Sequence, residues 1–254
     1  MINVILCGCG GRMGRAVTDA VAGSDTLRIV AGVDINASSI GTVCSFPVYD
    51  SISDFPDSAD VIIDFSHHSA LPSLCEYATK HNTPLVVCTT GHTEEELAMM
   101  NKTAESVAVF FSRNMSIGIN LIIEMSRRAA KTLGLDFDIE IIEKHHNKKL
   151  DAPSGTALMI AEKLAEDREN TELVYDRHSV RQQRKSSEIG IHAVRGGTIV
   201  GEHEVIFAGN NEIITLSHSA TSREIFANGA IKAAEFVAGR SPAMYDMSDI
   251  INKI

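Results

Sequence analysis

Side chains able to do acid–base chemistry are densest between residues 143 and 156, which read EKHHNKKLDAPSGT. Within six residues this segment holds two histidines and three lysines, namely His145, His146, Lys144, Lys148 and Lys149. An imidazole can transfer a proton near neutral pH, and ammonium groups attract anions. Ser154 and Gly155 precede an apolar-periodic helix, whose unpaired N–H groups add a second attraction for an anion. The segment therefore predicts a site for a small carboxylate beside a proton donor.

The two histidines can also be interpreted without a catalytic role. On a strand, adjacent side chains point to opposite faces, so only one of His145 and His146 is expected to meet a given reacting atom. A lone histidine is more often structural or exposed than catalytic, and this alternative stays open. Metal binding is disfavoured because the pair lacks an H-x-x-x-H partner, and we expect no metal.

A glycine-rich turn near the amino terminus, Gly8-Cys9-Gly10-Gly11-Arg12-Met13-Gly14, follows a short apolar strand and opens a helix. Such a turn can hold a dinucleotide pyrophosphate on helix N–H groups. The spacing departs from G-x-G-x-x-G, because Met13 stands where the third glycine would be, and it reads G-x-x-G-x-x-G instead. Asp34 ends the second strand, 20 residues after Gly14, where an acid accepts hydrogen bonds from the adenosine ribose. A packing turn or a helix-capping aspartate would explain one of these features but not both.

The coenzyme preference depends on the residues around Asp34. Its carboxylate repels the 2′-phosphate of NADPH unless a cation neutralises it, and neither Ile35 nor Asn36 is cationic. Arg12 is the basic residue of the glycine turn and suits the pyrophosphate better than a 2′-phosphate. We therefore predict that NADH serves at least as well as NADPH.

Alternating strands and helices through the first half predict a doubly wound parallel sheet of the Rossmann type, in an α/β chain. The expected strands are 4–6, 27–34, 61–65, 84–88 and 107–111, and the expected helices are 12–21, 69–80 and 94–105.

Beyond residue 116 the pattern changes to a second α+β domain with an open mixed sheet. The expected helices are 117–131 and 156–165, and the expected strands are 137–144, 188–195, 198–207 and 212–217. Short glycine and asparagine links between the last three strands predict antiparallel pairing. The polar stretch 167–187 is typical of a mobile surface excursion. The helix 224–238 is expected to pack on the first domain, which gives domains of 1–116 with 223–254 and 117–222.

Composition narrows the classes of partner and compartment. The 254 residues carry a net charge of −10, which disfavours nucleic acids and anionic membranes as partners. The five cysteines are odd in number and lack a C-x-x-C pair, so a disulfide framework is not expected. Because the amino terminus lacks the features of a signal peptide, we expect a cytoplasmic protein.

A hydride-carrying coenzyme and a cationic pocket with a histidine together predict a reduction, in which an acid protonates the charge left by hydride addition. Two alternatives stay open. Another two-domain dehydrogenase of amino-acid metabolism would keep the glycine turn and Asp34 without requiring residues 145–156. A dinucleotide-sensing protein without turnover would present the basic segment to a partner.

The chain resembles the dihydrodipicolinate reductase family over nearly its whole length, and the segment E-x-H-H-x-x-K-x-D-A-P-S-G-T-A is highly specific. The other matching segments are 8–15, 64–66 (DFS), 89–91 (TTG), 114–116 (NMS), 195–197 (RGG), 200–203 (VGEH), 222–223 (SR) and 226–227 (FA). The resemblance implies reduction of 4-hydroxy-tetrahydrodipicolinate to tetrahydrodipicolinate with NADH or NADPH, in diaminopimelate and lysine biosynthesis.

The resemblance also implies roles for individual residues. His145 would donate the proton, and Lys149 would hold the substrate and support that transfer. The substrate carboxylates would be bound by His146, Lys149, Ser154, Gly155 and Thr156. The coenzyme would be bound by Gly8, Gly11, Arg12, Met13, Gly14, Asp34, Phe65, Thr89, Thr90, Gly91, Arg113, Asn114 and Met115, with residues 89–91 and 113–115 at the nicotinamide end.

Two positions depart from the family pattern, since family members often carry an aromatic residue in place of Met115 and an arginine in place of His67. Members of the family are usually homotetramers assembled through the sheet of the second domain, and a hinge closes their domains over the ligands. By resemblance, residues 117–222 therefore bind the substrate and form the oligomer contacts.

Overall fold

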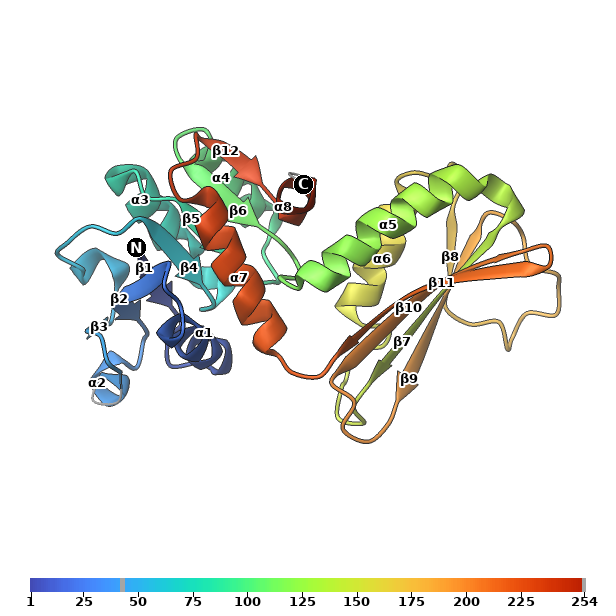
Figure 1. Ribbon diagram of the computed structural model, residues 1–254, viewed down its shortest axis with the longest axis horizontal. Helices are drawn as coiled ribbons and strands as arrows, with labels where there is room; N and C mark the ends of the chain where they lie inside the picture. Colours follow the sequence, from blue (N-terminus) through green and yellow to red (C-terminus); the bar gives the residue numbers. More distant parts are fainter. Residues whose placement is uncertain (42–43, 253–254) are drawn as a thin grey trace. The chain divides into compact units, whose positions relative to one another are not determined.

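A computed structural model describes residues 1–41 and 44–252 (Figure 1). The chain divides into two compact units, of which the first comprises Met1–Ile117 with Arg223–Ile254 and the second Gly118–Ser222. The sequence pattern placed these boundaries between 116 and 117 and between 222 and 223. Each unit is described by itself below.

The first unit is built on a parallel sheet in the order β12-β6-β5-β4-β1-β2-β3. Such a strand order, with β1 at the centre and the chain winding outwards in both directions, is that of a Rossmann-type sheet. The predicted doubly wound sheet is therefore confirmed. The strands are β1 (Ile2–Cys7), β2 (Leu27–Val33), β3 (Val48–Tyr49), β4 (Val61–Asp64), β5 (Leu85–Val87), β6 (Ala108–Phe111) and β12 (Ala243–Tyr245).

The helices of this unit begin where their sequences offer start signals. Thr93 and Glu96 form a reciprocal capping box at the start of α4, and a proline stands in the first turn of α3. Asn82, with φ of 52°, ends α3 in the left-handed conformation. The helices are α1 (Arg12–Ala22), α2 (Ala37–Ile40), α3 (Leu71–His81), α4 (Glu94–Ala104), α7 (Glu224–Val237) and α8 (Met247–Ile251), with 3₁₀ turns η1 (Ile52–Asp54) and η2 (His68–Ala70).

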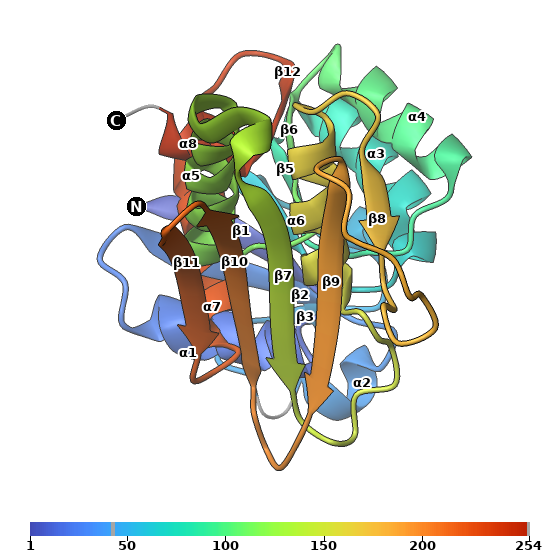
Figure 2. The same ribbon diagram turned by 90° about the vertical axis from the view of Figure 1, so that its right-hand side faces the viewer.

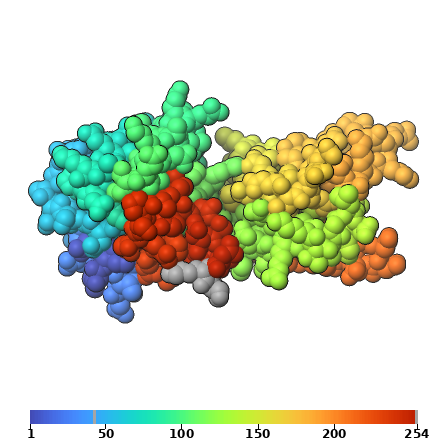
Figure 3. All heavy atoms as spheres, turned by 90° about the horizontal axis from the view of Figure 1, so that it is seen from above, coloured from blue at the N-terminus to red at the C-terminus, as the bar shows by residue number. Residues whose placement is uncertain are grey.

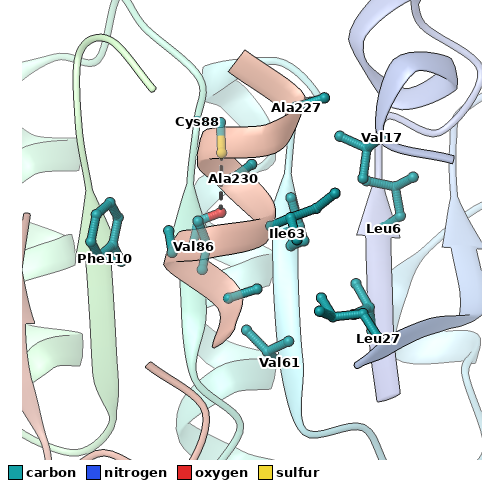
Figure 4. Close-up of a cluster of buried hydrophobic side chains, with 14 of the residues drawn as sticks. Leu6, Val17, Leu27, Val61, Ile63, Val86, Cys88, Phe110, Ala227 and Ala230 are labelled. Carbon is teal, nitrogen blue, oxygen red and sulfur yellow. Dashed lines mark hydrogen bonds between the residues drawn. The ribbon is translucent and has the colours of Figure 1, made fainter. Parts of the chain in front are cut away.

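Helix α7 returns from the far end of the sequence to cover one face of this sheet, as expected. Its small residues Ala227 and Ala230 pack over Ile63 and Val86 in a buried cluster that also contains α1 (Figure 4). Gly229 allows the closest approach, because a Cβ there would lie 1.7 Å from the carbonyl oxygen of Met115. A second cluster on the opposite face packs α3 and α4 against the same strands. In Figure 3 the red carboxyl-terminal segment accordingly lies against the blue and green parts of its own unit.

The second unit contains a mixed sheet in the order β11-β10-β7-β9-β8 (Figure 2). Alternate residues of β7 and β10 are buried beneath α5 and α6, which lie on one face of the sheet. The predicted open α+β sheet is confirmed. The elements are α5 (Ile117–Leu133), η3 (Gly134–Asp136), β7 (Asp138–His145), α6 (Gly155–Ala165), β8 (Glu172–Val174), β9 (Glu188–Arg195), β10 (Gly201–Gly209) and β11 (Glu212–Ala220).

One predicted pairing is wrong. Strands β10 and β11 form the expected antiparallel hairpin around Asn210 and Asn211, but β9 and β10 do not pair with each other. Strand β7 lies between them, parallel to β9 and antiparallel to β10. Because β7 pairs with both β9 and β10, it is the central strand of the sheet, and it carries His145.

The polar stretch 167–187 contains a short strand that the sequence pattern did not predict. It contributes strand β8, which pairs with β9. The Arg184 guanidinium donates hydrogen bonds to the carboxylates of Asp138 and Glu140 and to the carbonyl oxygens of Ile139 and Glu188. The many charges of this stretch therefore fasten it to the sheet. The sequence pattern also missed the short elements α2, β3, β12 and α8.

Candidate active site

The glycine turn of the first unit is shaped by two close backbone approaches. Gly8 has φ of +74°, and a Cβ on it would lie 2.5 Å from the carbonyl oxygen of Phe65. A Cβ on Gly14 would lie 2.2 Å from the carbonyl oxygen of Gly8. Both positions therefore require glycine. Gly11 precedes α1 without a side-chain cap, so the first turn of that helix presents backbone N–H groups for an anion.

Asp34 is fastened to this turn from the end of β2. Its Oδ2 accepts a hydrogen bond of 3.0 Å from the Gly10 N–H, and its Oδ1 accepts one of 3.0 Å from the Asn36 N–H. These two bonds fix the carboxylate beside the glycine turn. The remaining lone pairs of its oxygens suit ribose hydroxyl donors.

A pocket of about 770 Å³ lies at this end of the sheet. Its walls bring together four of the predicted coenzyme residues, Gly8, Gly11, Asp34 and Phe65. Among the residues that the structure assigns to its walls are a second acid, Asp50, and one ionisable base, His67, but no lysine or arginine. A wall of this charge suits ribose hydroxyls better than a 2′-phosphate.

A smaller hollow of about 270 Å³ shares Phe65 and contains the predicted Thr89 and Thr90. Behind it Asp64 is fully buried; its Oδ1 accepts hydrogen bonds from the N–H and hydroxyl of Ser66, and its Oδ2 accepts one of 3.2 Å from the Thr89 hydroxyl. Burial raises the pKa of Asp64, although these hydrogen bonds oppose the shift. The Thr89 oxygen also lies 2.9 Å from Nε2 of His92. Asp64 thus ties together the two loops that line the hollow.

The other predicted coenzyme residues are spread over different environments. Arg12, Arg113 and Gly91 are exposed, and Met13 is half-buried. Asn114 is buried, and its Oδ1 accepts the Ser116 N–H. Met115 is 3% exposed and packs in the core beneath α7, outside both hollows. The structure therefore does not bring the Met115 side chain to the predicted nicotinamide end.

In the second unit, His145 ends β7 next to a buried acid. Its Nδ1 lies 2.6 Å from Oε2 of Glu143, two residues earlier on the same face of the strand. A carboxylate only accepts hydrogen bonds, so Nδ1 carries the proton of this bond and Nε2 is left for other partners. A Cβ at Gly201, on β10, would lie 3.1 Å from that Nε2. Glycine at this position keeps space open beside it.

Glu143 has no exposed surface and accepts hydrogen bonds from three residues, Arg195, Ser154 and His145. The two terminal nitrogens of Arg195, on β9, donate hydrogen bonds of 2.7 Å to its two oxygens, and the Ser154 N–H donates one of 2.9 Å to Oε1. Burial alone would raise the pKa of Glu143, but the hydrogen bonds from Arg195, His145 and Ser154 outweigh it and lower the pKa. Glu143 is therefore a carboxylate that fixes the proton donor and the start of α6.

Three of the predicted carboxylate-binding residues, Ser154, Gly155 and Thr156, form the amino terminus of α6. Ser154 caps this helix by accepting the Ala157 N–H on its hydroxyl oxygen. Gly155 and Thr156 form the first helical positions, and nothing lies within 4 Å of a Cβ built on Gly155. The half-buried Lys149 ammonium lies 2.9 Å from Oδ1 of Asp151. Lys149 and the Gly155 N–H both contact the Asp151 carboxylate and lower its pKa, so this helix start and its ammonium stabilise an anionic group.

Two further histidines belong to the segments around this site: His146, which was predicted, and His203, which was not. His146 lies just beyond β7 and is half-buried. His203, on β10, is buried, with its Nε2 3.1 Å from the Ser154 hydroxyl oxygen and its ring centroid 5.2 Å from that of His145. Burial, with a smaller contribution from neighbouring His145, lowers the pKa of His203 to about 4. This imidazole is therefore neutral at neutral pH.

Two family models match successive parts of the chain, and the second extends past Ser222 into residues that the structure places in the first unit. Residues 2–115 match the family model described as "Dihydrodipicolinate reductase, N-terminus", and residues 118–251 match "Dihydrodipicolinate reductase, C-terminus". The chain belongs to the dihydrodipicolinate reductase family. It is thus an oxidoreductase with a Rossmann-type domain for NADH or NADPH.

Individual members of the family match this chain in sequence over nearly their full lengths. The chain is 51% identical to the 4-hydroxy-tetrahydrodipicolinate reductase of Caldanaerobacter subterraneus subsp. tengcongensis, covering 100% of this chain and 99% of that protein. It is 47% identical to the protein of the same name from Clostridium tetani, covering 99% and 98%.

Solved structures give the same result. The dipicolinate-bound dihydrodipicolinate reductase from Paenisporosarcina sp. TG-14 superposes with a TM-score of 0.84 at 26% identity, covering 98% of this chain and 99% of that one. A myo-inositol dehydrogenase from Corynebacterium glutamicum, at 18% identity with a TM-score of 0.60 and coverage of 92% and 86%, shares the fold alone.

Three residues around the site in this enzyme's second unit were not predicted: Glu143, Arg195 and His203. Glu143 carried a signal, because it stands two positions before His145 and a strand places both on one face. Arg195 and His203 lie in two of the segments that match the family, RGG and VGEH, but the residues themselves do not reveal their neighbours. Those contacts depend on register, in which Arg195 pairs with His145 and His203 pairs with Glu143. Within residues 1–41 and 44–252, no group of three metal-binding side chains gathers, and no helix has the length and hydropathy of a membrane span.

Proposed function

We propose that this enzyme reduces 4-hydroxy-tetrahydrodipicolinate to tetrahydrodipicolinate with NADH or NADPH, in diaminopimelate and lysine biosynthesis. Water forms from the 4-hydroxyl group and a hydrogen of the ring, and the unsaturated ring then gains a hydride at C4, supplied by the coenzyme, and one proton. The coenzyme is oxidised and the ring is reduced, so electrons and atoms balance.

The first unit holds the coenzyme in this proposal. The glycine turn and the first turn of α1 bind the pyrophosphate, and Asp34 accepts hydrogen bonds from the adenosine ribose. Phe65, Thr89 and Thr90 line the smaller hollow where the nicotinamide end is placed. The buried Asp64 stabilises that hollow by holding Ser66 and Thr89.

The second unit holds the substrate and supplies the proton. One substrate carboxylate binds the amino terminus of α6 through Ser154, Gly155 and Thr156, with the Lys149 ammonium and His146 beside it. His145 donates the proton from Nε2, because Glu143 occupies Nδ1 and stabilises the imidazolium.

The observation that carries this proposal is the arrangement around Glu143, in which one buried carboxylate fixes both the proton donor and the anion-binding helix start. A protein that only senses dinucleotides has no need of such an acid–base pair. A dehydrogenase acting on a different substrate has no need of a dicarboxylate site beside it.

A coupled assay tests the proposal. Nicotinamide oxidation is followed by absorbance while the condensation product of pyruvate and aspartate semialdehyde is generated in the cuvette. We expect oxidation with this product and none with either precursor alone. The His145→Gln variant should lose about 10²-fold or more in kcat, in the range of general acid catalysis, while still binding pyridine-2,6-dicarboxylate. Absence of oxidation by the natural chain would contradict the proposal.

We also propose a cytoplasmic homotetramer assembled through the second unit. The face of its sheet away from α5 and α6 carries the Lys144, Glu202 and Glu204 cluster, and Ile213 on edge strand β11 is 69% exposed. Such a mixed surface suits pairing with a second copy. The cysteines of the chain are free thiols, as a reducing compartment favours. Light scattering of the purified protein should give the mass of four chains, and the mass of one chain would contradict this assembly.

A further inference from the structure

His203 is a buried imidazole that the proposed reaction does not use. It lies on β10, is 4% exposed, and places Nε2 3.1 Å from the hydroxyl oxygen of Ser154. Its Nδ1 is completely enclosed and finds no hydrogen-bond partner among the described residues. A neutral imidazole carries one proton, so this ring has to leave either a bare nitrogen or an N–H group unpaired at Nδ1.

The hydrogen bonds of Ser154 depend on which nitrogen holds that proton. The Ser154 oxygen already accepts the Ala157 N–H as the cap of α6. If His203 carries its proton on Nε2, it donates to the same oxygen, and the serine hydroxyl hydrogen is left for a third partner. If the proton is on Nδ1, then Nε2 accepts the serine hydrogen, and none remains for a ligand.

The surroundings of Nδ1 favour the first arrangement. A buried N–H group without an acceptor is rarer in proteins than a buried acceptor without a donor. The second arrangement would bury such an N–H group, whereas the first leaves only a bare nitrogen. The pKa of His203, lowered to about 4 by burial and by His145, keeps the ring neutral, so the choice of tautomer is a real one at neutral pH.

We propose that His203 is a positioning residue that donates from Nε2 to the Ser154 hydroxyl and thereby directs the hydroxyl hydrogen toward a substrate carboxylate. A carboxylate accepts hydrogen bonds and donates none, so only a serine turned in this way binds it. This inference rests on the proposed function, since it assigns a role within the same dicarboxylate site.

Substitution of His203 by residues with and without a donor tests the direction of this bond. His203→Met removes the N–H group at similar bulk, and we expect the Kd for pyridine-2,6-dicarboxylate, measured by calorimetry, to rise about tenfold, the value of one hydrogen bond. The KM should rise by a similar factor, with kcat changed by less than about twofold. His203→Gln can present an amide N–H near the position of Nε2 and should restore most of the affinity.

The opposite tautomer predicts the opposite result. If His203 accepted the serine hydrogen, its removal would release that hydrogen, and the Kd of His203→Met would be unchanged or lower, which would overturn the inference. A role in packing alone would lower the affinity of the Met and Gln variants equally, and this result would also overturn it. The surface histidine His192, which lies on β9 and contacts Glu140, supplies the control, and His192→Gln should bind as the natural chain does.

A double-mutant cycle tests whether His203 acts through Ser154. We expect His203→Met to have less than about a twofold effect on the Kd in a Ser154→Ala background, and an undiminished tenfold effect there would contradict the proposal. Thermal unfolding of each variant shows whether a loss of ligand affinity is caused by loss of the folded structure. Two-bond proton–nitrogen NMR correlations read the tautomer directly, and a proton on Nδ1 of His203 would exclude the proposed bond.

The outcome for the natural chain separates the two claims. If it neither oxidises NADH in the coupled assay nor binds pyridine-2,6-dicarboxylate, the proposed function fails. If it does both, and His203→Met binds as tightly as the natural chain, this inference alone fails.

Discussion

Nδ1 of His145 and Oε2 of Glu143 are 2.6 Å apart, and both side chains are buried on the same face of β7. Arg195 approaches the same carboxylate from β9 with two hydrogen bonds, so the acid is held from two sides. The hydrogen bond fixes the tautomer and the ring orientation of His145 together. In the proposed mechanism this pair turns an ordinary histidine into a directed proton donor.

Glu143→Gln should therefore lower kcat about 10²-fold, because the amide no longer stabilises the imidazolium. The measurement is kcat under saturating substrate. The matched control is Glu204→Gln, which removes a carboxylate that pairs with Lys144 on the other face of the sheet. An unchanged kcat for Glu143→Gln would refute the role assigned to the pair.

Lys149→Ala should raise KM and also lower kcat, since the ammonium attracts the bound dicarboxylate and the charge that develops on the ring. The neighbouring Lys148 is exposed and serves as the control. Steady-state kinetics of both variants give the result. Equal effects of Lys148→Ala and Lys149→Ala would indicate a general electrostatic attraction instead of a specific contact.

Gly8→Ala should destabilise the first unit by about 2 kcal/mol or more and weaken coenzyme binding. The new Cβ would meet the Phe65 carbonyl oxygen at 2.5 Å in a backbone conformation that disfavours alanine. Gly23, at the other end of α1, has φ of −97°, and the atom nearest to its Cβ position is the Ala20 carbonyl oxygen at 3.9 Å, so Gly23→Ala is the control. Thermal unfolding and NADH titration measure both effects, and wild-type NADH affinity in Gly8→Ala would contradict the assigned pyrophosphate site.

NADH should support a kcat/KM at least as high as that of NADPH. Asp34 is fixed beside the glycine turn by Gly10 and Asn36, and no lysine or arginine is found among the described residues of the pocket wall. A 2′-phosphate would face the Asp34 carboxylate without a compensating cation. A strong preference for NADPH in steady-state kinetics would show that another group neutralises this site.

The free energy of unfolding should fall as the pH is lowered from 6.5 to about 4. In this range His203 gains a proton in the unfolded chain, where its pKa is ordinary, but not in the folded chain, where burial lowers the pKa to about 4. This difference between the folded and unfolded pKa of His203 lowers the free energy of unfolding by about 3 kcal/mol at the lower pH. Besides burial, three neighbouring groups lower the pKa of His203, namely His145, His218 and Lys149. The Glu143 carboxylate acts in the opposite direction and favours protonation of His203.

Denaturant unfolding at a series of pH values measures this effect. His203→Gln has no proton to gain, so its stability should depend less on pH over the same range. An identical pH dependence in the two proteins would show that other groups carry it.

Most of the architecture could be predicted because strands and helices alternate with clear hydrophobic periods. The strands that were missed, β3, β8 and β12, have two or three residues each, too few for a period to be recognised. The wrong pairing of β9 with β10 has a different cause. Short links indicate neighbouring strands, but nothing local reveals that β7, from far earlier in the chain, lies between them.

The candidate site was predictable where a residue type and its position together define a chemical task, as with Gly8, Asp34, His145 and Ser154. Residues that act through a neighbouring side chain could not be predicted, because a contact across strands depends on the register of the strands. Arg195 and His203 acquire their roles only when β9 and β10 flank β7. The burial of the Met115 side chain was not predicted either, because it depends on α7, which returns from far later in the chain to cover it.

The central claim is that a hydride passes from the nicotinamide to the ring of the substrate, and isotope transfer tests it most directly. The natural chain is given NADH carrying two deuterium atoms at C4 of the nicotinamide, together with enzymatically generated 4-hydroxy-tetrahydrodipicolinate, and the product is analysed by mass spectrometry. We predict tetrahydrodipicolinate that contains one deuterium atom. Product without deuterium, or coenzyme that stays unoxidised, would contradict the account.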